Sequence, residues 1–217
     1  MAHRVIALLR SEAMGPQHRQ RAGTTQLQLR NGALLQLRPV SPDDLGALRR
    51  WFGTVSPESR YLRFHGNFSS LSEAHWRHLT VVDGRDQLGF VASIAGGVVG
   101  IGHVIRLAEA PHTGEIALLV SDPLQRLGIG GALRDRLVRA AGSVGITSLV
   151  AHVLPDNQAM RRLLEAGRFA ALKESGGTLI VELLPRREGQ RWRRILGVLF
   201  GLHPRWFRSR RRRLQPG

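Results

Sequence analysis

Hydrophobic and polar positions alternate in two short segments near the start of the chain. These segments, TQLQLR and ALLQLR, flank the dipeptide Asn31-Gly32. An Asn-Gly dipeptide between alternating segments is typical of a two-residue type I′ turn, because both central positions of that turn need a positive φ. We therefore predict an antiparallel hairpin as the first ordered element.

Three helices are predicted next, each beginning at a serine that can cap its first turn. Ser41 precedes Pro42 and two aspartates, and the helix continues to about residue 52. Ser56, followed by Pro57, starts a second helix that ends near residue 64, and Ser72 starts a third that ends near residue 80. Serine followed by proline or an acidic residue is a helix start signal, because the hydroxyl accepts an unpaired N–H of the first turn.

The pattern then changes to strands, and later to alternating helices and strands. Residues 88–94, 98–107 and 115–120 are predicted as a three-strand meander, with a turn at Gly96-Gly97 and a loop around Pro111. The elements predicted after it are a helix over 130–141, a strand over 148–154, a helix over 157–166 and strands over 169–172 and 178–183. The fold class is therefore α+β, with a central, mostly antiparallel twisted sheet flanked by helices.

Length and composition fit one globular domain with extensions. The chain has 217 residues, of which 42% are hydrophobic and 22% charged, so it can form a core. We predict a flexible N-terminal arm over residues 1–23, a domain over 24–185 and a basic amphipathic tail over 186–217. The chain has no cysteine, which excludes disulfides and cysteine nucleophiles. No run of about 20 apolar residues is present, so we expect a cytoplasmic location.

The formal net charge of +16 is concentrated at the ends of the chain. Residues 38–185 have sixteen basic and fourteen acidic residues, whereas residues 186–217 have eleven arginines and one glutamate. Three interpretations of the tail stay open. It lies as a short helix on an anionic membrane surface, it binds nucleic acid or another polyanion, or its apolar side packs on the domain while the arginines are solvated.

Residues 114–141 carry the strongest functional signal. A hydrophobic strand leads into a loop with Gly128, Gly130 and Gly131, and then directly into an amphipathic helix. The glycines let a ligand approach the backbone, and the start of a helix offers unpaired N–H groups and a partial positive charge. This predicts a pyrophosphate-binding loop. The glycine patterns of Rossmann and P-loop proteins are absent, which excludes those classes.

The pattern Gln125-x-x-Gly128-x-Gly130 resembles the acetyl-CoA loop of the GNAT superfamily of N-acetyltransferases. The later segment PDNQAMRRLLEAGRFA resembles the GNAT segment in which an asparagine opens a helix, although Arg168 interrupts its Gly-Phe pair. The resemblance covers residues 35–183. Within it, LRPVSPDDL and SPESRYLRF are similar to the acetyltransferase domain of bacterial Pat-type protein lysine acetyltransferases. It implies a GNAT-like sheet that is splayed at the acetyl-CoA site.

The resemblance implies a donor site made mostly of main chain. Strand amides would hold the pantetheine arm, the loop would wrap the pyrophosphate, and Asn157 would bond the pantetheine or only cap its helix. Arg126 and Arg134 are either phosphate ligands or solvated surface arginines. The implied cofactor-binding residues are Leu118, Leu119, Val120, Gln125, Arg126, Leu127, Gly128, Ile129, Gly130, Gly131 and Asn157.

Acetyl transfer to an amine requires a base, because an alkylamine with a pKa of about 10.4 is mostly protonated at neutral pH. The resemblance implies that Glu115, at the start of the strand beside the cofactor, is this base. The alternative is an edge-strand residue that faces solvent. Tyr61, the only tyrosine, lies in the wrong segment to be the general acid of many GNAT enzymes, so water or a backbone group would protonate the leaving thiolate.

The histidines do not predict a metal site. His75 and His78 lie three residues apart on a predicted helix, but no third ligand is evident, and we interpret them together with His65, His103 and His112 as surface residues. We therefore expect acetyl-CoA as acyl donor, no metal, and a protein lysine as acceptor. The alternatives are a small-molecule amine as acceptor, or a non-catalytic acyl-CoA-binding sensor or membrane- or nucleic-acid-associated module.

Overall fold

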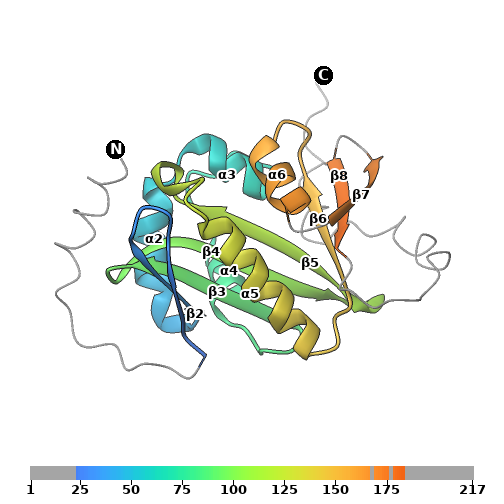
Figure 1. Cartoon of the computed structure of the whole chain (residues 1–217), viewed down its shortest axis with the longest axis horizontal. Coiled ribbons are helices and arrows are strands. Elements are labelled where there is room, and N and C mark those ends of the chain that lie inside the picture. The colour runs from blue at the N-terminus through green and yellow to red at the C-terminus, as the bar shows by residue number, and fades with distance from the viewer. Residues whose placement is uncertain (1–22, 167–168, 176–177, 184–217) are drawn as a thin grey trace, which may run out of the picture. The chain divides into compact units, whose positions relative to one another are not determined.

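An open, mixed sheet of eight strands runs through the part of the chain that the structure describes (Figure 1). The structure is a computed structural model, and it describes residues 23–166, 169–175 and 178–183. The strand order is β1-β2-β3-β4-β5-β6-β8-β7, and every neighbouring pair is antiparallel except β5 and β6. The predicted α+β class with a mostly antiparallel sheet is confirmed.

The element bounds follow the predicted order. The strands are β1 Thr25–Gln28, β2 Leu34–Pro39, β3 Gln87–Ile94, β4 Gly97–Leu107, β5 Ala110–Val120, β6 Ser148–Val153, β7 Phe169–Ser175 and β8 Thr178–Leu183. The α-helices are α2 Leu45–Thr54, α3 Pro57–Phe64, α4 Glu73–Thr80, α5 Ile129–Ser143 and α6 Gln158–Ala166, and short 3-10 turns cover Pro42–Asp44 and Asp122–Leu124.

Helices cover both faces of the sheet, and each face has its own hydrophobic cluster. On one face α5 contributes Leu133 and Leu137, which pack with Ile116 of β5. On the other face α2, α3 and α4 pack their aromatic side chains with Leu119 of β5, and the ring of Phe52 makes edge contacts with two neighbouring rings. Successive residues of a strand point to opposite faces, so β5 contributes to both clusters.

Two of the three predicted capping serines start their helices as predicted. Ser56 and Ser72 each accept the backbone N–H three residues further on, at 3.1 and 3.4 Å. Ser41 instead donates its own backbone N–H to Oδ2 of Asp44 at 2.8 Å, and α2 begins after a single 3-10 turn. Local hydrogen bonds therefore fix where these helices begin.

The first hairpin forms, but the predicted type I′ turn is wrong. Only Gly32 of the Asn31-Gly32 pair has a positive φ, of 81°. Gly32 donates its N–H to the carbonyl of Leu29, and Leu29 donates its N–H to the carbonyl of Ala33, both at 2.9 Å. The loop therefore has three residues, a common hairpin form that ends on a left-handed glycine. Oδ1 of Asn31 accepts the N–H of Ala33 at 3.2 Å, which stabilises this turn.

Two other turns also differ from the prediction. Between β3 and β4 the turn residues are Ala95 and Gly96, both with positive φ, so the turn lies one residue earlier than expected. β5 begins one residue before Pro111, which therefore lies in a strand and not in a loop. The pairing of β5 with β4 is irregular between Arg106 and Leu107. Proline has no backbone N–H to donate, so a strand tolerates it where the ladder is interrupted.

The pairing between β5 and β6 is short. Residues 113–115 of β5 pair with residues 148–150 of β6, and both strands then continue without pairing to each other. The sheet opens at this point, as the resemblance implied.

Candidate active site

At the open edge of β5, two residues direct their main-chain groups away from β4. Ser121 donates its N–H to the carbonyl of Val99 at 2.9 Å, so the main-chain groups of Ser121 point toward β4. Along a strand, the main-chain groups of successive residues point alternately to the two neighbouring strands. The main-chain groups of Leu119 therefore face β4, whereas those of Leu118 and Val120 face the opening. The side chain of Leu119 is buried in the core, so of the three predicted strand residues two are placed to bond a ligand.

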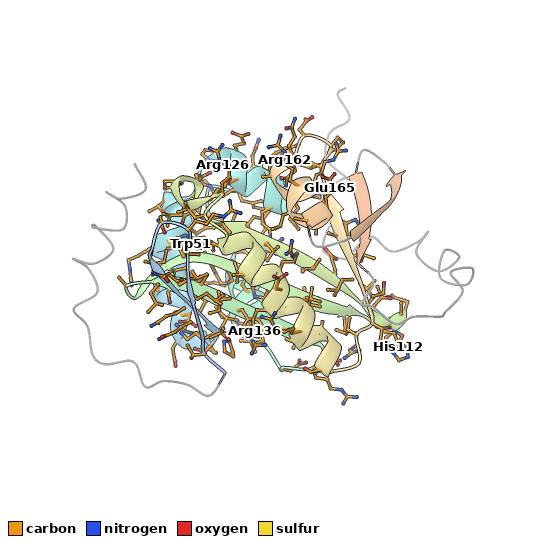
Figure 2. All side chains as sticks on the ribbon, in the orientation of Figure 1. Trp51, His112, Arg126, Arg136, Arg162 and Glu165 are labelled. Atoms are coloured by element: carbon orange, nitrogen blue, oxygen red, sulfur yellow. The ribbon has the colours of Figure 1, made fainter. Side chains whose placement is uncertain are left out.

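The loop after β5 contains two left-handed residues. Arg126 has a φ of 62° and Gly128 has a φ of 101°, and Gly128 is the residue before α5. A left-handed conformation is unfavourable for arginine, and it turns successive N–H groups toward one side, as in anion-binding nests. Arg126 itself is exposed on the outside of the loop (Figure 2).

The start of α5 offers unpaired donors. No acceptor among the described residues bonds the N–H groups of Ile129, Gly130 and Gly131. A Cβ placed on Gly128 or Gly131 would meet no atom within 4 Å, so the space above these residues is open. The side chains of Leu127 and Ile129 belong to the core and only their main chain is available.

Three buried or half-buried hydrogen bonds fix the beginning of this loop to α3. The carboxylate of Asp122 accepts the N–H of Ser56 at 2.9 Å and the hydroxyls of Ser56 and Ser59 at 2.6 Å. Burial alone would raise the pKa of Asp122, but these bonds outweigh it and the pKa lies below its ordinary value. We call Asp122, Ser56 and Ser59 the loop anchor.

The side chains of Trp51 and Gln125 extend the loop anchor. Nε1 of Trp51 donates to Oγ of Ser121 at 2.7 Å within the core. Nε2 of Gln125 lies 3.3 Å from Oγ of Ser59 and 3.4 Å from the carbonyl of Val120. Sequence reasoning identified Gln125 only through the loop pattern, and it missed Asp122, whose partners lie more than 60 residues earlier in the chain.

Glu115 lies inside the sheet and not at its edge. It pairs with Ile105 on one side and with Val150 on the other, and its side chain is half-buried. The interpretation of Glu115 as an edge residue that faces solvent is therefore wrong. It points to the same face as Leu119, which is the face covered by α2, α3 and α4.

Cationic and titratable side chains surround Glu115 on this face. Burial lowers the pKa of Arg63, in α3, to about 10, and the negative charge of Glu115 opposes that change. Burial also lowers the pKa of His78, in α4, an effect that Arg63 strengthens and Glu115 weakens. The carboxylate therefore lies close enough to titratable groups on two helices to affect their pKa values.

His103 is a core residue, so its interpretation as a surface residue is wrong. It is 4% exposed, and its Nε2 lies 2.8 Å from the carbonyl of Leu79. Burial lowers its pKa to about 3, although the bond to Leu79 favours the charged form. A neutral ring that donates from Nε2 satisfies the carbonyl at the end of α4. Among the described residues there is no group of three or more His, Asp or Glu side chains that could hold a metal ion.

Arg134 and Asn157 have structural partners. Arg134 is buried, and its guanidinium binds Asp135 and the carbonyl of Leu163 in α6, so it is neither solvated nor directed to a phosphate. Oδ1 of Asn157 accepts the N–H of Met160 at 3.0 Å and caps α6. Capping is therefore the observed role of Asn157.

The geometry is a strand edge with free amides, a glycine loop and a helix start, and it agrees with the comparisons with known proteins. The model of the acetyltransferase (GNAT) family matches residues 48–168. The chain belongs to the GNAT family. The donor of this family is acetyl-CoA, and this chain is expected to share it.

The GNAT relatives include Pat-type proteins. Acetyltransferase Pat of Mycolicibacterium smegmatis is 30% identical over 159 residues, which are 72% of this chain and 47% of Pat. The chain thus spans about half the length of that relative. Acetyltransferase PA5475 of Pseudomonas aeruginosa is 27% identical over 150 residues, which cover 67% of this chain and 80% of PA5475. The crystal structure of the GNAT domain of S. lividans PAT has a TM-score of 0.72 and 27% identity, covering 75% of this chain and 97% of that domain.

The residues present fit acetyl-CoA. Free N–H groups at the start of α5, below open space at Gly128 and Gly131, suit a pyrophosphate. The main-chain edge at Leu118 and Val120 suits the amides of a pantetheine arm, because an extended ligand can pair there like an added strand.

The predicted arm and tail are not tested by this geometry. Residues 1–22 and 186–217 lie outside the described residues, and so does the proposed contact of the tail with a membrane or nucleic acid. No helix in the described part of the chain is both long and apolar enough to span a bilayer. The cytoplasmic location stays a prediction.

Proposed function

We propose that this GNAT protein transfers an acetyl group from acetyl-CoA to a primary amine, with a protein lysine as acceptor and Glu115 as general base. The observation that carries the proposal is the place of Glu115. It is the last residue of β5 that pairs with β6, so its carboxylate lies where the sheet begins to open. The donor and the base then meet at one end of the opening.

The spacing along β5 supports this arrangement. At about 3.3 Å per residue, the Cα atom of Glu115 lies roughly 10 Å from that of Leu118, the first residue with free main-chain groups. A glutamate side chain and one water molecule can span most of that separation. This separation supports the proposal that Glu115 acts on an amine that approaches from the face of α3 and α4.

Each residue has a defined task in the proposed reaction. Bound acetyl-CoA supplies a thioester carbonyl carbon. Glu115 accepts a proton from the acceptor, directly or through water, so that the amine nitrogen is neutral when it attacks. The N–H of Val120 donates to the carbonyl oxygen as negative charge develops there. A thiol has a pKa of about 8.5, so the leaving thiolate needs little assistance from an acid.

The choice of a protein lysine rests on the similarity to Pat-type proteins. The first of the segments that carry this similarity forms the end of β2 and the 3-10 turn after it, and the second forms α3, which helps to cover the face of Glu115. A small-molecule amine remains the competing acceptor. The two are separated by comparing lysine-containing proteins and peptides with free amines as substrates.

The test is substitution of Glu115 by glutamine. Because removal of a general base costs about 100-fold or more, we expect Glu115→Gln to lose turnover by that factor while binding acetyl-CoA as the native protein does. Calorimetry measures binding, and thiol release together with mass spectrometry of the acceptor measures transfer. Glu109→Gln is the matched control, since Glu109 is an exposed acid in the turn before β5.

Each outcome separates the hypotheses. Unchanged turnover in Glu115→Gln removes Glu115 from the mechanism. A native protein that binds acetyl-CoA but acetylates no protein, peptide or free amine is the non-catalytic sensor. A native protein without affinity for acetyl-CoA refutes the donor site itself.

A further inference from the structure

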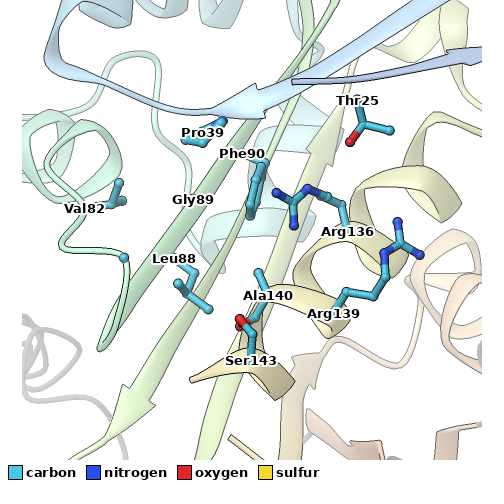
Figure 3. Close-up of a pocket in the computed structure, with 11 residues that line it drawn as sticks. Thr25, Pro39, Val82, Leu88, Gly89, Phe90, Arg136, Arg139, Ala140 and Ser143 are labelled. Atoms are coloured by element: carbon cyan, nitrogen blue, oxygen red, sulfur yellow. The ribbon is translucent and has the colours of Figure 1, made fainter. Parts of the chain in front are cut away.

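A second cavity lies away from the acetyl-CoA site, between the C-terminal half of α5, β3 and the start of β1 (Figure 3). Its volume is about 400 Å³, which is within the range of small-molecule sites. Val82 and Leu88 contribute an apolar wall, and Arg136 and Arg139 contribute a cationic one. The cavity therefore combines the two surfaces that an amphipathic anion requires.

Arg136 packs on an aromatic ring in this cavity, and its Nε is unpaired within the described residues. Its guanidinium carbon lies 4.3 Å from the centroid of the Phe90 ring, and the two groups can be seen together in Figure 3. Its Nε is buried and has no hydrogen-bond partner. The side chain as a whole is half-buried and lines the cavity, so a ligand would reach Arg136 through its accessible part and not through the buried Nε.

The positive charge of the cavity is uncompensated. Arg38, Arg49, Arg106 and Arg134 each form an ion pair with an acidic side chain. Within the described residues Arg136 and Arg139 form no ion pair, and no acidic residue lines the cavity. Burial lowers the pKa of Arg136, and the charge of Arg139 lowers it further, which shows that the two cations repel one another.

We propose that this cavity binds a small organic anion. Its carboxylate or phosphate group bonds to the guanidinium groups of Arg136 and Arg139, and its apolar body lies against Val82 and Leu88. Guanidinium groups match both head groups in a bidentate way. The site is distinct from the acetyl-CoA site, because that site lies at the other end of α5; in Figure 2 Arg126 and Arg136 lie well apart.

The experiment uses calorimetric titration of the full chain with four probes. Phenyl phosphate and benzoate carry a charged head and an apolar ring, inorganic phosphate carries the head alone, and benzyl alcohol carries the ring alone. We expect saturable binding of phenyl phosphate or benzoate, and the tighter of the two identifies the head group. Inorganic phosphate and benzyl alcohol should bind about tenfold more weakly or not at all, because each lacks one of the two contacts.

Matched variants assign the binding to the cavity. Arg136→Gln, and independently Arg139→Gln, should weaken the better probe about tenfold or more. Arg77→Gln, on the exposed surface of α4, removes the same charge and should change the affinity less than about twofold. Saturating acetyl-CoA should leave the affinity unchanged.

Three results would overturn the proposal. These are no saturable binding of either aromatic anion up to about 10 mM, an equal loss in Arg77→Gln, and displacement of the probe by acetyl-CoA. The last result would assign the binding to the donor site. None of these results depends on acetyl transfer, so the proposal stands or fails separately from the proposed function.

Discussion

The loop anchor gives a quantitative prediction for Asp122→Ala. The substitution removes the acceptor of three hydrogen bonds, two from hydroxyls at 2.6 Å and one from a backbone N–H at 2.9 Å. Bonds to charged groups contribute about 1.5 to 3 kcal/mol each, but Asp122 is only partly buried, so we use about 1 kcal/mol per bond. The free energy of unfolding should therefore fall by about 3 kcal/mol, which corresponds to about 6 to 12 °C in Tm.

The assay is urea unfolding followed by tryptophan fluorescence, repeated from neutral to acidic pH. The carboxylate of Asp122 is stabilised in the folded state, since its pKa lies below the ordinary 3.8. Its contribution is therefore fully present above about pH 3.8 and is lost as the pH falls through the lower folded value. The difference between native protein and Asp122→Ala should be constant near neutrality and shrink only below that pH.

Glu109→Ala is the control, because it removes an exposed acid and should change the unfolding free energy by less than about 0.5 kcal/mol. Asp122→Asn keeps the shape and one acceptor oxygen, so its loss should lie between the two. If Asp122→Ala were as stable as Glu109→Ala, the three bonds would not hold the loop to α3, and the loop anchor would have no energetic role.

Two further predictions concern the backbone and a buried ring. Gly128→Ala places a side chain on a residue with a φ of 101°, so it should lower the free energy of unfolding by about 1 kcal/mol and weaken acetyl-CoA binding. Gly53→Ala, in α2 with open space around it, is the control and should stabilise the protein slightly. Urea unfolding measures the stability of both variants, and calorimetry measures their binding. His103 has a folded pKa of about 3, below the ordinary 6.5, so its stabilising contribution declines as the pH falls below about 6.5. His103→Gln keeps a donor for the carbonyl of Leu79, and it should reduce the slope of the unfolding free energy between pH 6.5 and 4 by about 1.4 kcal/mol per pH unit. An unchanged pH dependence of stability would contradict the buried neutral ring.

Local sequence patterns predicted the helices and strands well. They did not predict the turn type where a side-chain hydrogen bond determines it. The capping serines Ser56 and Ser72 act within three residues, so the sequence contains the whole interaction. The turn at Asn31 depends on whether its side-chain oxygen accepts the N–H of Ala33, and the Asn-Gly pair alone does not decide that. An alanine in a left-handed turn, as at Ala95, carries no sequence signal at all.

The glycine loop was predictable because its main parts are contiguous in sequence. The hydrogen bonds of Asp122 with Ser56, and the electrostatic interaction of Arg63 with Glu115, join segments more than 50 residues apart, and no spacing rule places them together. The burial of His103 was missed for the same reason, because its partner Leu79 lies in a separate helix. Tertiary contacts, rather than local pattern, therefore define the acceptor side of the site.

The three-residue pairing of β5 with β6 sets a limit on how this protein can be stabilised. Extending the ladder past Glu115 would add hydrogen bonds, but it would occupy the amides of Leu118 and Val120. The same main-chain groups can therefore either extend the sheet or bind a ligand, but they cannot do both. Thermostable variants of this chain should accordingly carry their improvements elsewhere.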